Sequence, residues 1–147
     1  MHSALRSVFR LLAAFGLAVS VALSAQAAPV TKADAQKVRA VIRAQLAAFA
    51  ADDAERAFSY AAPGIRAMFG SPERFLAMVR EAYPVVYRPA SVGFLQPEAL
   101  GRTVIQAVEM ADTDGTLWVA VYHLERQRNG AWRIASCELV PSDGRMI

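Results

Sequence analysis

The change of residue pattern at Pro84 constrains the fold of this chain more than any other feature of its sequence. Before Pro84, apolar residues recur at helical spacing. After it, segments rich in β-branched and aromatic residues alternate with turns that contain Pro, Gly and Asp. Helices followed by consecutive strands predict an α+β fold with the helices packed on an antiparallel sheet, and they exclude an alternating α/β fold.

Capping residues predict where the helices begin. Thr31, with Asp34 three residues later, is a variant of the capping box and starts a long helix. Asp53 and Ser71 are caps for two further helices, and residues 65–69 can add one more turn between them. The apolar face of the long helix holds Val38, Ile42, Leu46 and Phe49.

The length of one turn decides the register of the predicted strands. A three-residue turn, with Gly130 in a left-handed conformation, pairs Leu124 with Ile134 and Glu125 with Arg133. A two-residue turn would pair Glu125 with Ile134 instead. We favour the first register because it matches two apolar side chains and two opposite charges. The predicted strands cover residues 85–87, 91–95, 103–110, 116–126 and 132–140.

Neither face of this sheet is plainly polar. The chosen register places Trp118, Tyr122, Leu124 and Ile134 on one face. It places Val119, Val121, His123, Cys137 and Leu139 on the other. We expect helices to cover one face, and a curled strand or a second copy of the chain to cover part of the other. A homodimer is therefore predicted.

Residues 1–27 have the features of a signal peptide. Arg6 and Arg10 precede an apolar run of about 13 residues, shorter than the roughly 20 that a membrane-spanning helix needs. Ala25 and Ala27 supply the small side chains of a cleavage site, so we predict a cut after Ala27. The sequence thus predicts one domain over residues 28–147, periplasmic or secreted and without membrane attachment after cleavage; an uncleaved anchor is the alternative.

The charged residues do not indicate a nucleic-acid partner. The predicted signal peptide holds two of the 16 basic residues and none of the 13 acidic ones, so its removal leaves a nearly balanced charge. The remaining basic residues are scattered among acids rather than clustered in a stripe. Cys137 is the single cysteine, so the domain has no intramolecular disulfide to stabilise it.

Two segments resemble a known family. One is residues 58–89, FSYAAPGIRAMFGSPERFLAMVREAYPVVYRP, and the other is the terminal segment with Trp132, Arg133, Ile134, Cys137 and Leu139. Both resemble an exported bacterial family known as domain of unknown function 4864. The order of elements is also similar to the cone-shaped α+β fold of nuclear transport factor 2, ketosteroid isomerase and SnoaL-type cyclases. The resemblance implies a curved sheet around a long helix with a pocket at the cone mouth, and it implies no activity.

Phenols can line an apolar pocket and present a hydroxyl to a ligand. In pockets like that of ketosteroid isomerase, a tyrosine and buried acids polarise a carbonyl. Strand acids and the one histidine outside the predicted signal peptide are the groups here that could act as acid or base. The candidate pocket residues are Tyr60, Tyr83, Tyr87, Glu109, His123 and Glu138.

The sequence predicts neither a metal site nor a cofactor. Asp112 begins a segment like a calcium loop, but His123 occupies the position that needs a bidentate glutamate. The acids at residues 52–55 are explained by helix capping, and Cys137 lies among apolar neighbours typical of a core cysteine. Gly-rich phosphate loops, nucleophile elbows, CxxC and HExxH motifs do not occur in the sequence.

Two functions are consistent with these features. The first is a non-enzymatic exported domain that binds a small apolar ligand or a protein partner, and we favour it because no convergent catalytic set is visible. The alternative is a small SnoaL-like isomerase, dehydratase or hydrolase that uses pocket tyrosines with Glu109, Glu138 or His123.

Overall fold

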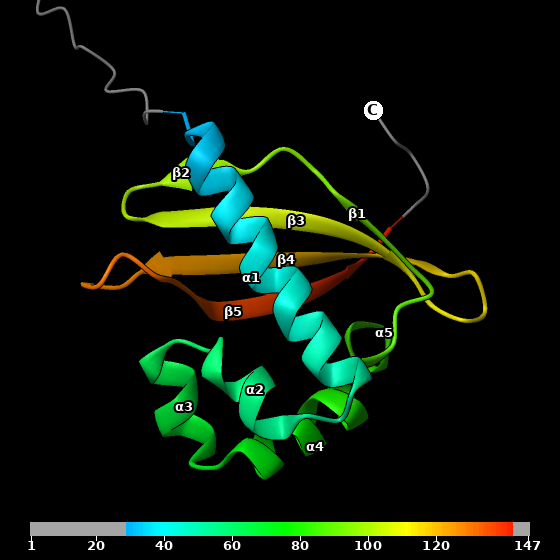
Figure 1. Cartoon of the computed structure of the whole chain (residues 1–147). Coiled ribbons are helices and arrows are strands. Elements are labelled where there is room, and N and C mark those ends of the chain that lie inside the picture. The colour runs from blue at the N-terminus through cyan, green and yellow to red at the C-terminus, as the bar shows by residue number, and fades with distance from the viewer. Residues whose placement is uncertain (1–28, 143–147) are drawn as a thin grey trace, which may run out of the picture.

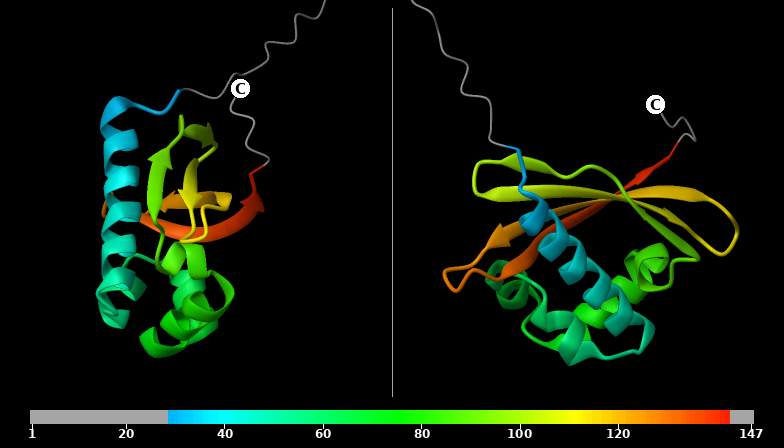
Figure 2. Two further views of the ribbon diagram at one scale, coloured as in Figure 1. Left: turned by 90° about the vertical axis from the view of Figure 1, so that its right-hand side faces the viewer. Right: turned by 45° about the horizontal axis from the view of Figure 1, so that its top comes forward.

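The computed structural model describes residues 29–142, and in this range the chain forms five helices and five strands (Figure 1). The helices come first and pack on one face of a twisted antiparallel sheet (Figure 2). The fold is therefore α+β, as predicted. The predicted signal peptide lies outside the described residues, and none of the described helices is both long enough and apolar enough to cross a membrane.

The three predicted caps are confirmed. The Thr31 hydroxyl accepts a hydrogen bond from the Asp34 amide at 3.1 Å, and the Asp53 carboxylate accepts one from the Arg56 amide at 3.1 Å. The Ser71 hydroxyl caps the fourth helix in the same way. The helices are α1 (Lys32–Ala50), α2 (Ala54–Ser59), α3 (Pro63–Phe69), α4 (Pro72–Ala82) and α5 (Pro84–Tyr87).

The prediction of a strand over residues 85–87 is wrong, because this segment forms the single helical turn α5. Pro84 stands at its first position, and the Tyr87 amide donates to the Tyr83 carbonyl at 3.0 Å. Val85 and Val86 are buried against the core in this turn. Burial of two β-branched side chains from a helical turn thus outweighs their preference for strands.

The sheet has the order β1-β3-β4-β5. Strand β2 also pairs with β3, along residues 103–105, whereas β1 pairs with residues 108–111 of the same strand. The predicted register of the β4–β5 hairpin is confirmed, with Leu124 opposite Ile134 and Glu125 opposite Arg133. Gly130 has a φ of 84°, the left-handed conformation that the three-residue turn requires. The strands are β1 (Ser91–Phe94), β2 (Glu98–Leu100), β3 (Thr103–Ala111), β4 (Leu117–Arg126) and β5 (Trp132–Pro141).

A β-bulge in β5 corrects the predicted faces of the sheet. The pairing shifts by one residue between His123 and Leu124, which leaves Ala135 as the extra residue of β5. Cys137 therefore pairs with Tyr122. Leu139 likewise faces the helices, and both side chains pack against the core rather than on the opposite face. The sequence prediction assumed a regular strand and so inverted the faces beyond the bulge.

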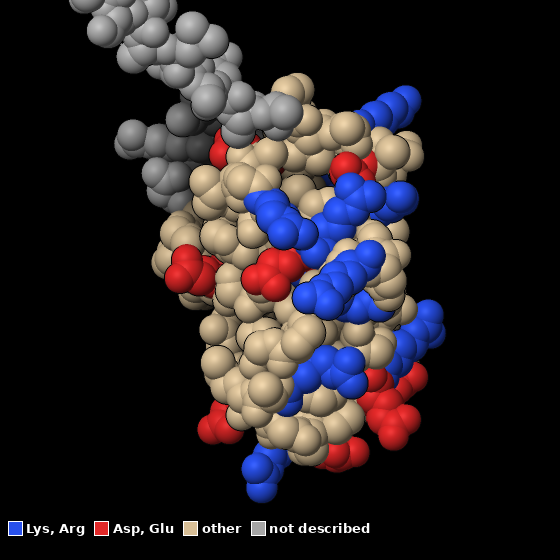
Figure 3. All heavy atoms as spheres, turned by 90° about the vertical axis from the view of Figure 1, so that its left-hand side faces the viewer, with Lys and Arg blue, Asp and Glu red and all other residues tan. Residues whose placement is uncertain are grey.

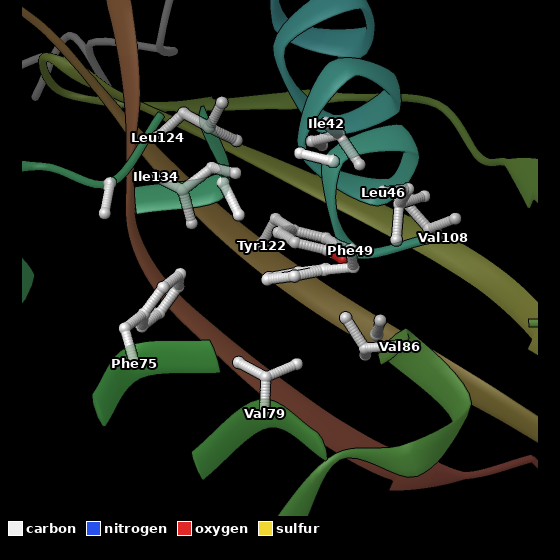
Figure 4. Packing of buried hydrophobic residues seen from close by; sticks show 14 of the residues in the cluster. Ile42, Leu46, Phe49, Phe75, Val79, Val86, Val108, Tyr122, Leu124 and Ile134 are labelled. Atoms are coloured by element: carbon white, nitrogen blue, oxygen red, sulfur yellow. The ribbon is translucent and has the colours of Figure 1, made fainter. Parts of the chain in front are cut away.

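The core lies between α1 and the face of the sheet that the helices cover (Figure 4). Apolar residues of α1 at helical spacing meet the alternate residues of β3 and β4 that point the same way. The edge of β5 is covered by the α2–α3 connection, since the Ile134 amide donates to the Tyr60 carbonyl at 2.9 Å and the Ala62 amide donates to the Ile134 carbonyl at 2.8 Å. The central buried residues include Val38, Ile42, Phe49, Val108, Met110, Tyr122 and Leu124.

Candidate ligand pocket

An apolar cavity of about 240 Å³ lies between the helices and the inner face of β4 and β5. Its wall on the helical side comes from α1, α3, α4 and α5, and its wall on the sheet side comes from β4 and β5. We call it the cone pocket. It is lined by Gln45, Phe49, Ala61, Ile65, Met68, Phe69, Phe75, Met78, Val79, Tyr83, Val86, Tyr122, Ile134, Ser136 and Cys137.

Aromatic rings form one wall of the cone pocket. Phe75 of α4 lies at the centre of this group, with its ring centroid 5.9 Å from that of Phe49 and 5.6 Å from that of Phe69. Phe58 packs on Phe75 from the other side at 5.4 Å. These tilted and edge-on contacts are the favourable geometries for aromatic pairs, so the wall is held in place by its own packing.

Helix α3 forms the outer cover of the cone pocket. None of the side chains of α3 is fully buried, yet Ile65, Met68 and Phe69 all line the cavity. Met68 is 74% exposed, which places it at the rim between cavity and solvent. Helix α3 is thus the one helix of this wall that has no fully buried side chain.

The polar groups of the cone pocket are few and uncharged. Among the described residues that line it, none carries a charged side chain. Gln45 is buried and already donates to the Ala57 carbonyl at 3.1 Å. The Tyr122 hydroxyl is buried and has no hydrogen-bond partner within residues 29–142. It is therefore a hydrogen-bonding group available to an occupant of the cavity.

The Cys137 thiol and the Tyr122 hydroxyl of the cone pocket stay neutral over the physiological pH range. Burial raises the pKa of Cys137 to about 12. Burial, together with the nearby Cys137 thiol, raises the pKa of Tyr122 well above its ordinary value. A thiol with so high a pKa is a poor nucleophile, because the thiolate is the reactive form.

Of the three tyrosines predicted from sequence, Tyr83 lines the cone pocket. The Tyr60 side chain lies outside it and hydrogen-bonds with Arg56, which raises the pKa of that guanidinium. The Tyr87 hydroxyl also lies outside and donates to the carboxylate of Asp52. The structure therefore does not bring the three phenols together.

Tyr87 belongs to a polar cluster that joins the α1–α2 connection to α4 and α5. Arg80 and Arg88 both pair with the Asp52 carboxylate, at 3.1 Å and 3.2 Å. The two guanidinium groups also lie over the Tyr87 ring, at 5.3 Å and 4.6 Å from its centroid. The Tyr87 hydrogen bond and the two arginines lower the pKa of Asp52. This cluster is exposed and satisfied, which is typical of a structural link.

The predicted acids and histidine lie on the outer face of the sheet, opposite to the cone pocket. Glu109 pairs with Val119, and Glu138 pairs with Val121, at positions that alternate with the buried ones. His123, opposite Ser136, shares this outer face. The sheet thus separates all three groups from Tyr83 and from the cavity.

Sequence reasoning missed Tyr122 as a site residue, although it placed Tyr122 on the same face as Leu124 and Ile134. That placement already implied a phenol in the core, and a core phenol needs a hydrogen-bond partner for its hydroxyl.

The predicted turn at Asp112 is confirmed, because its carboxylate accepts from the amides of Asp114 and Thr116 at 3.0 and 2.9 Å. In the part of the chain that the structure describes, no group of three or more His, Cys, Asp or Glu side chains could hold a metal ion.

Comparisons with known proteins give a family and a related structure. The sequence model of a family described as Domain of unknown function (DUF4864) matches residues 31–147. A crystal structure of an NTF-2-like protein of unknown function from Burkholderia xenovorans LB400 is similar, with 19% sequence identity and a TM-score of 0.46; the match covers 77% of this chain and 88% of that chain. No curated protein matches the sequence.

Proposed function

The chain belongs to the family described as Domain of unknown function (DUF4864), and we propose that it is a non-enzymatic domain that holds a small apolar ligand in its cone pocket. The observation that carries this proposal is the lining of that cavity, which is apolar except for uncharged groups and contains a buried hydroxyl without a partner. Concave apolar sites with a few convergent polar groups are typical of ligand-binding pockets.

The volume of the cone pocket limits the ligand. A dry apolar cavity of about 150 Å³ accepts benzene, so the 240 Å³ of this cavity suits a substituted single ring or a chain of comparable length. The ligand is neutral, because the described lining offers no charged group to pair with a buried ion. One hydrogen-bonding atom on the ligand would satisfy the Tyr122 hydroxyl.

The location of the ionisable groups favours binding over the alternative of a SnoaL-like isomerase, dehydratase or hydrolase. A general acid or base must lie within hydrogen-bonding reach of its substrate. Glu109, His123 and Glu138 lie across the sheet from the cavity, and the raised pKa of Cys137 keeps its thiol protonated. Tyr83 and Tyr122 are the remaining ionisable side chains of the described lining.

We also propose that the domain acts outside the cytoplasm, after cleavage behind Ala27. The support is the sequence of residues 1–27, with two arginines, a short apolar run and small residues at the cleavage position. Fractionation of cells that produce the full chain, followed by sequencing of the mature N-terminus, tests this. The expected product is periplasmic or secreted and begins at Ala28, whereas an intact chain in the membrane fraction would contradict the proposal.

Ligand binding is tested with the processed protein and two neutral probes, p-cresol and 1-hexanol, by calorimetric titration. Cys137→Leu extends a larger side chain into the cavity and should weaken binding at least tenfold. Val140→Leu is the matched control, because Val140 lies three residues further along β5 and is exposed. Equal binding by the Cys137→Leu and Val140→Leu proteins would contradict the proposal, as would a wild-type protein that binds neither probe and carries no ligand by native mass spectrometry.

A further inference from the structure

A second cavity, separate from the cone pocket, lies at the opposite end of α1. This groove of about 480 Å³ is formed by the start of α1, the β2–β3 turn and the β4–β5 turn, and it shares no lining residue with the cone pocket. The face that carries these turns also shows a band of Lys and Arg side chains (Figure 3). We call this second cavity the arginine groove. It is lined by Pro29, Val30, Thr31, Asp34, Ala99, Gly101, Arg102, Thr103, Val104, Arg126, Gln127, Arg128 and Trp132.

Three arginines converge on the arginine groove from two turns that are far apart in sequence. Arg102 comes from the β2–β3 turn, and Arg126 and Arg128 come from the end of β4 and its turn. Within residues 29–142, none of the three has an ion pair or a side-chain hydrogen bond. Asp34 is the one acid among the described lining residues. The groove therefore carries an excess of positive charge that the protein itself does not neutralise.

The floor of the arginine groove contains a buried donor without an acceptor. Trp132 is only 5% exposed, and its indole Nε1 has no hydrogen-bond partner in the described part of the chain. The Arg126 guanidinium lies 6.0 Å from the centroid of the Trp132 ring, so the aromatic ring and the cation are neighbours. A buried N–H that donates to nothing is destabilising, and such groups are rare in native proteins.

The first turn of α1 adds a third favourable element. Thr31 and Asp34 line the groove, and α1 continues for 19 residues. The amides at the start of a helix of this length carry a partial positive charge that favours anions. The start of a long helix, three arginines without an ion pair and a tryptophan with an unpartnered indole N–H thus line one cavity. Each of these features favours the same kind of occupant.

We propose that the arginine groove binds an organic anion, a small molecule in which a phosphate or carboxylate is attached to an apolar body. The arginines and the helix terminus hold the charged group by hydrogen bonds of the kind that guanidinium forms with oxyanions. The apolar body lies along Val30, Ala99 and Val104, which supply the non-polar part of the lining. This site differs in chemistry from the cone pocket, whose described lining contains no charge.

Hexyl phosphate is the probe that tests this assignment. In a Trp118→Phe protein, Trp132 is the single tryptophan, so its fluorescence reports on the groove. We expect saturable binding of hexyl phosphate that weakens as salt is raised. Inorganic phosphate should bind at least tenfold more weakly, and 1-hexanol should leave the Trp132 signal unchanged. Equal binding of inorganic and hexyl phosphate would overturn the assignment to an organic anion.

Variants separate the arginine groove from a general surface effect. Arg126→Gln and Arg128→Gln should each weaken binding three- to tenfold, whereas Arg74→Gln, in the exposed part of α4, should not. Asp34→Asn should tighten binding, because it removes the one acid of the groove. Loss of the same size in Arg74→Gln and Arg126→Gln would overturn the proposal.

Two further variants test the donor and the location. Trp132→Phe keeps an aromatic ring but removes the N–H together with the five-membered part of the indole, and calorimetry should show binding weakened about threefold. Cys137→Leu narrows the cone pocket and should leave hexyl phosphate binding intact. Loss of binding in Cys137→Leu would place the probe in the cone pocket and refute a separate anion site.

Discussion

Tyr122 and Cys137 are paired across β4 and β5, and both side chains line the same apolar cavity. The pair exists because the β-bulge at Ala135 turns Cys137 toward the helices. The Tyr122 hydroxyl on the neighbouring strand is buried and without a partner in residues 29–142. The Cys137 thiol thus reaches the cone pocket because of one irregularity of the sheet.

Replacing Tyr122 with Phe is expected to increase the free energy of unfolding of the ligand-free protein by about 1 kcal/mol, because it removes a buried hydroxyl that forms no hydrogen bond. Urea denaturation measures the change. Tyr83→Phe is the matched control and should have an effect below about 0.5 kcal/mol, since Tyr83 lines the same cavity but is only half-buried. A destabilised Tyr122→Phe protein would mean that the hydroxyl has a partner in solution.

The stability of the domain is expected to fall as the pH rises from about 9 toward about 12. The Cys137 thiol has an ordinary pKa of 9.0 when unfolded, and burial raises the pKa to about 12 in the fold. Between these values the unfolded chain loses the proton and the folded chain keeps it, so unfolding is favoured by up to about 1.4 kcal/mol per pH unit. Cys137→Ala should flatten the dependence of stability on pH in this window. An unchanged slope in Cys137→Ala would contradict the prediction.

Asp52 is expected to titrate below its ordinary pKa of 3.8, chiefly because the Tyr87 hydroxyl donates to its carboxylate. Since this pKa is lowered by folding, the stabilisation it gives is present above pH 3.8 and is lost as the pH falls through the folded pKa. Carboxyl NMR of the Tyr87→Phe protein should show the Asp52 pKa moved up toward 3.8. Tyr83→Phe is the control, and an equal shift in that variant would exclude a direct effect of Tyr87.

Gly130→Ala is expected to destabilise the domain by about 1 kcal/mol, because its φ of 84° is unfavourable for a residue with a Cβ. No atom lies within 4 Å of the added Cβ, so the effect comes from the backbone alone. Gly64→Ala is the matched control, since Gly64 lies in α3 with similar open space and an ordinary φ. That control should be neutral or stabilising in thermal denaturation. Equal destabilisation by both would contradict the assignment of strain to Gly130.

We expect two copies of the domain to associate through the outer face of the sheet. Ile105, Val119 and Val121 lie on this face, and no helix of residues 29–142 covers it. Val121→Arg should convert the dimer to a monomer in sedimentation velocity, whereas Val92→Arg, at an exposed position of β1, should not. A wild-type protein that stays monomeric at high concentration would refute the prediction.

Local signals made much of the fold predictable. The three helix caps depend on residues within four positions of one another, and the hairpin register depends on a turn of three residues, so both can be derived from short segments. The helical turn at residues 85–87 could not be derived from a short segment. Its two valines favour a strand, and only their burial against the core stabilises a helical turn. The short strand β2 was also missed, since residues 98–100 pair with β3 without a strong pattern of their own.

The candidate site was less predictable than the fold. Tyr83 lines the cavity, whereas Tyr60 and Tyr87 form polar contacts with Arg56 and Asp52 that no sequence pattern indicates. Glu109 and Glu138 were predicted as pocket candidates because both are strand acids. Their side of the sheet depends on strand alternation and, for Glu138, on the bulge.

The bulge at Ala135 also decides which alternate residues of β5 face the helices and which face outward. Had the pairing of Leu124 with Ile134 continued without interruption, Glu138 would stand opposite Ala120 among the cavity side chains, and Cys137 would face outward. The same sequence would then surround a carboxylate instead of a thiol. Whether this cavity is suited to neutral ligands or to proton transfer is therefore decided by where one backbone irregularity falls, without the exchange of a single side chain.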